Sequence, residues 1–253
     1  MQNITVIIPL IDLSTQENLV LFQKCLSSIP QGMQVICVGA KEVIDLIPEN
    51  SDINITKIVS TGDNTIPSHV NLGVENVTTK YFSVVEIDDV FSKNWFNGSQ
   101  EYISKMGDDV ICYLPLTEII DFNSSDILGY ANEAFWASSF SEEIGFIDNT
   151  SLQDYLNINT NCGVFDTEMF KESGKLKSSM KILYWYEFLL RVTYKGKKVF
   201  IIPKVGCFHN VNRPGANDVR SKMSEKEFEW WLDLANKEYF FQNDRNKTYD
   251  ENN

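Results

Sequence analysis

Four short apolar segments alternate with helix-like segments over the first third of the chain, and this alternation is what most constrains its fold. The expected strands are residues 4–9, 34–39, 53–59 and 81–85. The expected helices are residues 18–28, 41–47 and 65–75. Strands that alternate with helices are typical of a Rossmann-like, doubly wound α/β sheet, whose mainly parallel strands are buried between two helical layers.

The second half of the chain is less regular, but strand-like and helix-like segments still alternate. Strands are predicted at residues 110–116, 161–166 and 198–203. Helices are predicted at residues 95–106, 167–173, 184–194 and 224–239. Residues 124–149 are rich in Ser, Asn and aromatic side chains without clean periodicity, so loop and short helix are expected there.

No internal repeat or low-complexity linker interrupts this pattern. We therefore expect a single domain over residues 1–241, built on one mixed sheet with a C-terminal helix, and a polar tail at 242–253. That helix opens with a capping box, Ser224 to Glu227. The long, hydrophobic chain is sufficient to bury a sizeable core.

Composition narrows the classes of partner and compartment. The net charge of −13 disfavours a broad electrostatic grip on nucleic acid or on an anionic membrane. The five cysteines form no CxxC pair, which favours reduced core residues in a cytoplasmic protein. No apolar run reaches membrane-spanning length and no signal peptide is apparent, so a soluble protein without a membrane partner is expected.

Three carboxylates end the apolar segment Tyr81–Val85, and they mark the first candidate site. Glu86, Asp88 and Asp89 fall within four positions directly after this strand. Unpaired carboxylates are costly to bury, so they favour a place where a cation or polar ligand neutralises them. Ligands of open α/β sheets gather at the carboxyl ends of the strands, and Mg²⁺ and Mn²⁺ prefer oxygen ligands. A solvated acidic turn is the alternative interpretation.

Several motifs in order along the chain resemble those of family-2 glycosyltransferases with the A-type fold. The motifs are Ile4–Pro9, Asn71-Leu-Gly73, Tyr81–Asp89, Asn161–Phe165 with Met169–Gly174, and Tyr186–Arg191 with Val199–Pro203. The resemblance covers about residues 4–210, and parts of the second half also resemble glycosyltransferase-like proteins of large tailed phages. It implies a nucleotide-sugar-binding half at 1–116 and an acceptor-side half at 117–241.

The resemblance further implies a nucleotide-sugar donor, with a UDP-sugar favoured, and a Mn²⁺ or Mg²⁺ ion. The function implied is metal-dependent transfer of the donor sugar to a hydroxyl acceptor in the cytoplasm, or in the host cytoplasm for a phage protein. The implied metal ligands are Asp88, Asp89 and His209. The implied donor-binding residues are Pro9, Asp63, Asn71, Glu86 and Asp88. A capped or surface histidine remains the alternative for His209. For His69, a direct role at the site is less favoured than the absence of such a role.

This chain departs from the family pattern at two places. Its second strand ends in Cys37–Lys41 without the usual base-gripping carboxylate, so Asp63 is the suggested substitute. Tyr184 and Trp185 occupy the positions of the acidic pair that supplies the general base. Glu187 is then the candidate catalytic base, and an ion pair with Arg191, four residues on, is its alternative.

The acceptor is open, since a modified DNA base, a protein or a glycan all fit the resemblance. Aromatic residues near the expected acceptor cleft suggest stacking, with core packing as the alternative: Phe135, Trp136, Tyr184, Trp185 and Tyr186. Basic residues cluster at Lys171, Lys175, Lys177, Lys181 and Arg191. A catalytically degenerate relative that binds sugar nucleotides or glycans, and a structural or assembly protein, are the alternative functions.

Overall fold

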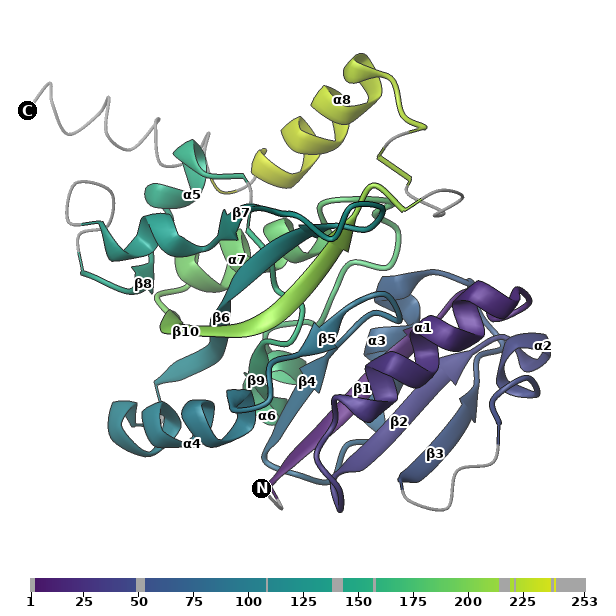
Figure 1. Cartoon of the computed structure of the whole chain (residues 1–253). Coiled ribbons are helices and arrows are strands. Elements are labelled where there is room, and N and C mark those ends of the chain that lie inside the picture. Colours follow the sequence, from purple (N-terminus) through teal and green to yellow (C-terminus); the bar gives the residue numbers. More distant parts are fainter. Residues whose placement is uncertain are drawn as a thin grey trace, which may run out of the picture.

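The computed structural model describes residues 3–48, 53–107, 109–137, 143–156, 158–213, 219–220, 222–237 and 239. Its strands form one ten-stranded sheet with the order β3-β2-β1-β4-β9-β6-β10-β5, while β7 pairs with β6 and β8 pairs with β10 (Figure 1). The strands are β1 Ile4–Leu10, β2 Gln34–Gly39, β3 Asn54–Val59, β4 Tyr81–Val84, β5 Val90–Phe91, β6 Val110–Asp121, β7 Ile127–Ala131, β8 Phe146–Ile147, β9 Val164–Asp166 and β10 Lys198–Val211.

The described helices connect these strands. They are α1 Gln16–Ser27, α2 Lys41–Ile44, α3 Ile66–Glu75, α4 Trp95–Met106, the short 3₁₀ helix η1 Glu133–Trp136, α5 Ser151–Asp154, α6 Thr167–Glu172, α7 Tyr184–Tyr194 and α8 Glu225–Asn236. Two local signals in the sequence account for helix starts: Thr15 caps α1 through the Asn18 N–H, and Ser224 caps α8 through the Glu227 N–H.

Parallel and antiparallel pairs both occur in this sheet. The strands β3, β2, β1 and β4 are mutually parallel, as are β6 and β10. Strand β9 lies between the two parallel groups and pairs antiparallel with both β4 and β6. The mixed sheet that the sequence predicted is therefore confirmed.

Two hydrophobic clusters cover the two faces of the sheet. One contains apolar residues of α1, α2 and α4, among them Phe22, Ile44 and Trp95. The other contains residues of α3, α6 and α7, among them Val70 and Phe170. Helices on both faces make the sheet doubly wound, which confirms the predicted fold class. The C-terminal helix α8 packs through Trp231 into the second cluster, beside α7 (Figure 1).

The Asn71-Leu-Gly73 motif has a packing role in this fold. A Cβ atom on Gly73 would lie 2.8 Å from Cγ2 of Ile7, so glycine lets α3 approach β1 closely. The Asn71 amide holds the segment after α6, donating to the Leu176 carbonyl at 2.8 Å and accepting from its N–H at 3.0 Å. The motif therefore fastens α3 to both its neighbours.

Three parts of the sheet differ from the sequence predictions. Strands β6 and β10 run on to Asp121 and Val211, well beyond the predicted ends at residues 116 and 203. Their later parts pair with each other in register from Cys207 opposite Thr117 to Val211 opposite Asp121. The expectation of loop and short helix at 124–149 missed the strands β7 and β8, and β5 was not predicted. Strands β5 and β8 have only two residues each and pair with β10, which lies far along the chain. Strand β7 pairs with the neighbouring β6 but is mostly exposed, so none of the three has an apolar pattern that marks it.

Strands from both predicted halves, 1–116 and 117–241, share the one sheet. The assignment of 1–241 to a single domain stays a prediction, and the polar tail at 242–253 lies outside the described residues. None of the described helices is both long and apolar enough to cross a membrane.

Candidate functional site

The acidic turn between β4 and β5 lies at the carboxyl end of the parallel strands. Val85 continues β4 by donating to the Ile7 carbonyl at 3.2 Å, and the Asp89 N–H closes the turn onto the Glu86 carbonyl at 3.1 Å. Strand β5 follows at once and pairs antiparallel with β10, where Val90 lies opposite Phe208. Backbone pairing thus brings the residue after Phe208 beside the acidic turn.

Asp89 is the buried centre of the site, with only 1% of its surface exposed. Its Oδ1 lies 2.8 Å from Nδ1 of His209 and accepts the Asn210 N–H at 3.3 Å. Its Oδ2 accepts a hydrogen bond from the Asn161 amide. Both carboxylate oxygens are therefore occupied, and Asp89 orients His209 and Asn161 in this structure.

Asp88 and Glu86 are less enclosed than Asp89. The Asp88 side chain is 21% exposed, and its Oδ2 lies 3.5 Å from Nε of Arg213. The Asn210 amide donates to the Asp88 carbonyl and so fixes the backbone of the turn. Glu86 is half-buried. These two carboxylates are the ones in this turn that a ligand can reach.

The charges of this cluster are only partly compensated. Burial, followed by the negative charges of Asp88 and Asp89, raises the pKa of Glu86 to about 7. Burial and the Asp89 charge also raise the pKa of Asp88, against the effect of Arg213. The Asp89 carboxylate raises the pKa of His209 to about 9, although burial opposes this. The site therefore favours the binding of additional positive charge.

The contact between Asp89 and His209 bears on whether the acidic turn and His209 suit a divalent ion. No group of three or more His, Cys, Asp or Glu side chains is arranged to hold a metal among the described residues. A metal-binding histidine commonly uses its second ring nitrogen to contact a carboxylate, as Nδ1 of His209 does here. This contact is compatible with an ion held by Asp88 and Nε2 of His209 together with donor phosphates, and metal binding by these residues stays a prediction.

Glu187 lies in a different environment, inside a network of cations. It is 1% exposed, and Arg191 donates to both its oxygens at 3.0 Å. Lys177 lies 2.8 Å from Oε1, and the Tyr239 hydroxyl donates to the same atom at 3.1 Å. The ion pair with Arg191 that the sequence offered as an alternative is present, and a role for Glu187 as general base stays a prediction.

The other three residues that were predicted to bind the donor are Pro9, Asp63 and Asn71. Pro9 is buried in β1 and pairs with Val38 of β2, and Asp63 is exposed in the segment before α3. Asn71 makes its described side-chain contacts with Leu176. Donor binding by these three residues stays a prediction.

His69 is buried in α3, and burial lowers its pKa. Neither of its ring nitrogens makes a hydrogen bond with the described residues, although the Leu10 backbone lies close enough to oppose part of the pKa shift. Its burial favours a role in packing over a direct role at the site.

Most of the aromatic residues considered for the acceptor side belong to the core. Phe135 and Tyr186 are buried, and the ring of Trp185 stacks on Phe165 with centroids 5.0 Å apart. Tyr184, at the start of α7, lies close enough for the Glu86 charge to raise its pKa, after the larger effect of burial. Tyr184 thus lies near Glu86 while it packs against the hydrophobic core.

The basic cluster of the second half does not form an open cationic groove. Its lysines each pair with a glutamate: Lys171 with Glu168, Lys175 with Glu75, Lys177 with Glu187 and Lys181 with Glu227. Arg191 is buried against Glu187. The four glutamates offset most of the positive charge that contact with DNA would need.

Sequence reasoning missed the polar residues that surround the acidic turn, namely Asn161, Asn210, Arg213 and Asn18. Asn161 lies in a motif that the family resemblance identified, but no role was assigned to it. Asn210 and Arg213 follow His209 on the unexpected extension of β10 and the residues just after it. A longer predicted β10 would have placed both of them at the site.

Comparison with known proteins identifies the fold. No family model and no curated protein matches the chain. Among solved structures, S. aureus TarS 1–349 in complex with UDP-GlcNAc matches with a TM-score of 0.60 at 13% identity, over 93% of this chain and 65% of that one. The chain has a GT-A-like glycosyltransferase fold. TarS 1–349 in complex with UDP matches with a TM-score of 0.55 at 12% identity, over 93% and 64%.

The chain spans only part of the longer structure. S. aureus TarS matches with a TM-score of 0.57 at 11% identity, over 93% of this chain and 39% of that chain. Identities this low establish the fold, while donor, acceptor and activity have to be argued from the site.

Proposed function

We propose that the chain is a glycosyltransferase that moves a sugar from a nucleotide-sugar donor to a hydroxyl acceptor. The observation that carries the proposal is the acidic turn with Asp88 and Glu86 accessible, supported from behind by the contacts of Asp89 with His209 and Asn161. The turn lies at the carboxyl end of the parallel strands β1 and β4, where ligands of such folds bind. A uridine donor is favoured because the TarS structures of the same fold hold UDP and UDP-GlcNAc.

Metal dependence is part of the proposal. Asp88 and His209 would hold a Mn²⁺ or Mg²⁺ ion, with Asp89 fixing the orientation of His209, or also contacting the ion as the sequence predicted. Such an ion supplies positive charge to the diphosphate leaving group. Glu86 belongs to the acidic turn, where we expect it to contact hydroxyl groups of the donor, and Tyr184 of α7 lies near it.

We also place the protein in the cytoplasm, or in the host cytoplasm if a phage encodes it. The cysteines among the described residues are free and buried, as expected for a reducing compartment. A protein or a glycan suits the acceptor side better than DNA, because the lysines there are paired with glutamates.

One observation favours the second candidate, a relative that binds a sugar nucleotide without transferring the sugar. The positions of the usual acidic pair hold Tyr184 and Trp185, and Glu187 is enclosed by Arg191, Lys177 and Tyr239. If no carboxylate can deprotonate the acceptor, donor binding persists and turnover is lost.

Binding and turnover can be tested separately. We expect UDP or a UDP-sugar to raise the melting temperature in the presence of Mn²⁺, and this shift to disappear in Asp88→Asn. The matched control Asp45→Asn changes an exposed carboxylate at the C-cap of α2, paired with Lys41, and should keep the full shift. Release of sugar from UDP-GlcNAc then distinguishes an enzyme from a binding protein. Absence of a shift across a panel of nucleoside diphosphates and their sugars would overturn the proposal.

A further inference from the structure

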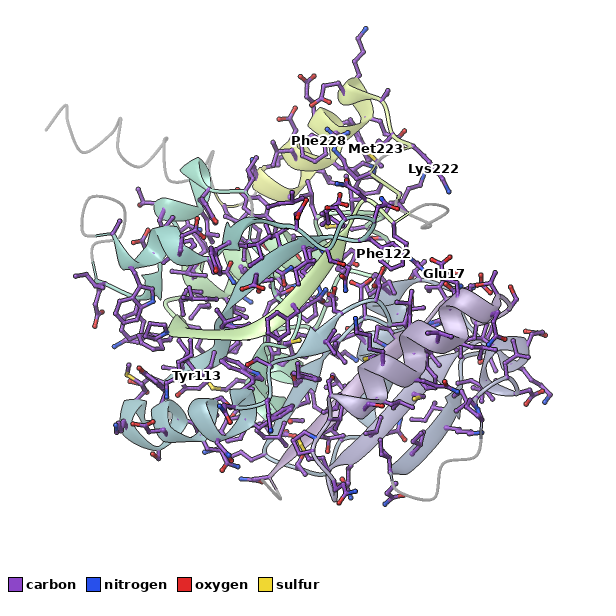
Figure 2. All side chains as sticks on the ribbon, in the orientation of Figure 1. Glu17, Tyr113, Phe122, Lys222, Met223 and Phe228 are labelled. Carbon is purple, nitrogen blue, oxygen red and sulfur yellow. The ribbon has the colours of Figure 1, made fainter. Side chains whose placement is uncertain are left out.

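Arg213 is a largely buried cation at the junction of three segments. It follows β10 by two residues, its side chain is 11% exposed, and it lies beside both α1 and the acidic turn. Figure 2 labels residues on the two sides of this junction: Glu17 on α1, and Phe122, whose N–H donates to the Val211 carbonyl at the end of β10. The Nη1 atom of Arg213 lies 3.8 Å from Oε1 of Glu17.

A relay of hydrogen bonds fixes the orientation of this guanidinium. Nη1 of Arg213 donates to Oδ1 of Asn18 at 2.7 Å. The Asn18 amide in turn donates to the carbonyl and to Oδ2 of Asp12, at 3.2 and 3.1 Å. The Ser14 N–H donates to Oδ1 of Asp12 at 2.7 Å. Arg213 is therefore held in place by a polar scaffold that is itself fully bonded.

The Nε atom of Arg213 is only weakly bonded among the described residues. It is buried and makes no hydrogen bond with them, and its ion-pair contact, Oδ2 of Asp88, lies 3.5 Å away. A buried donor without a hydrogen bond is unfavourable, and a guanidinium has a planar set of donors that matches phosphate oxygens. This donor lies beside the carboxylate that the proposed function assigns to the donor site.

We propose that Arg213 binds the diphosphate of the nucleotide-sugar donor and that Asn18 is the positioning residue for it. This inference rests on the proposed function. A diphosphate placed beside Glu86, Asp88 and Asp89 needs positive charge in addition to a metal ion. Arginine supplies it at every working pH, because its guanidinium is not deprotonated in proteins.

The test compares UDP with uridine, which has the same base and ribose but no phosphate. Calorimetric titration of wild type and Arg213→Gln with UDP and with uridine, each with Mn²⁺, isolates the phosphate contribution. We expect Arg213→Gln to weaken UDP binding about 10- to 100-fold, the size of a lost charge-assisted hydrogen bond, and to leave uridine binding unchanged. Arg213→Lys keeps the charge without the planar donors, so it should lie between the two.

Arg220→Gln is the matched control. Arg220 pairs with Glu225 at 2.9 Å and stacks on Phe228 with 4.1 Å to the ring centroid, away from the acidic turn. This variant should bind UDP as the wild type does. If Arg213→Gln does not fold, Asn18→Ala decides instead, because it keeps the cation and removes its support. It should weaken UDP binding several-fold while sparing uridine.

The outcomes separate this inference from the proposed function. If wild type binds UDP and Arg213→Gln binds it equally well, Arg213 does not contact the diphosphate and only this inference is overturned. An equal loss of UDP and uridine binding gives Arg213 a general structural role and also overturns it. If wild type binds neither UDP nor inorganic pyrophosphate, the proposed function fails together with it.

Discussion

Two buried sets of carboxylates in this molecule differ in how their charge is compensated. Glu187 on α7 has cations on both oxygens, and although burial alone would raise its pKa, the hydrogen bonds from Arg191 and Lys177 hold it below its ordinary value. The acidic turn places Glu86 and Asp88 together with raised pKa values. The difference teaches that a carboxylate with paired cations stabilises the fold, whereas a group of carboxylates with too few cations favours the binding of further positive charge.

Removing the compensated carboxylate should have the largest effect on stability. Glu187→Ala leaves Arg191, with its side chain 8% exposed, without its counter-charge, so we expect a loss of about 3–5 kcal/mol in the free energy of unfolding. Urea denaturation at pH 7 measures it. Because the folded pKa of Glu187 is lowered, its contribution should fade as the pH falls through that pKa. A stability close to wild type would mean that this network is dispensable, and the contrast drawn between Glu187 and the acidic turn would then be wrong.

Weakening the support behind the acidic turn should have an intermediate effect. Asn161→Ala removes the donor to Oδ2 of the buried Asp89, and we expect a loss of about 1–3 kcal/mol in the free energy of unfolding. Urea denaturation measures this loss as a shift of the midpoint, provided that the dependence of the free energy of unfolding on urea is the same in both proteins. Gln23→Ala, at an exposed position on α1, is a suitable control because it should cost little. If the two variants lose the same stability, the Asn161 contact contributes nothing specific.

Removing one negative charge from the acidic turn should stabilise the protein. This is the smallest of the three expected changes in the free energy of unfolding. The folded pKa of Glu86 is raised from 4.5 to about 7, so the folded state holds its proton to a higher pH than the unfolded state does. Stability should therefore fall as the pH rises between these values. We expect Glu86→Gln to match wild type at pH 4 and to exceed it by about 1–2 kcal/mol at pH 8, after allowance for water near this half-buried side chain.

Thermal unfolding of wild type and Glu86→Gln across this pH range provides the measurement. The sign distinguishes the two regions, because the Glu187 network loses stability as the pH falls, whereas the acidic turn loses stability as the pH rises from about 4.5 to about 7. A Glu86→Gln variant less stable than wild type at pH 8 would show that the acidic turn is already compensated.

The parts of the fold that follow from local signals were predictable from the sequence. The helix α4 has the predicted bounds of residues 95 and 106, because apolar spacing marks it. The pair of Glu187 and Arg191 lies four residues apart on α7 and could be anticipated in the same way. The later part of β10 could not, since its His209 and Asn210 are stable in a strand only beside the extended β6.

The charged residues of the site could be predicted from the sequence, but the polar residues that contact them could not. Glu86, Asp88, Asp89 and His209 were identified from the strand-end pattern and the family resemblance, and the structure brings them together. Their neighbours join them from far along the chain, as Arg213 meets Asn18 across 195 residues. Contacts of this kind are set by the packing of the sheet, which no local sequence pattern encodes.

The pairing of β5 with β10 has a consequence for how the protein is made. Asp89 leaves the ribosome well before its partners Asn161, His209 and Asn210, which follow it by 72, 120 and 121 residues. Until β10 has been synthesised, the nascent chain carries an acidic turn that stays hydrated, because carboxylates without partners oppose burial. Docking of β10 onto this turn is therefore expected late in folding, and a chain stalled earlier would expose an unfinished sheet edge to other proteins.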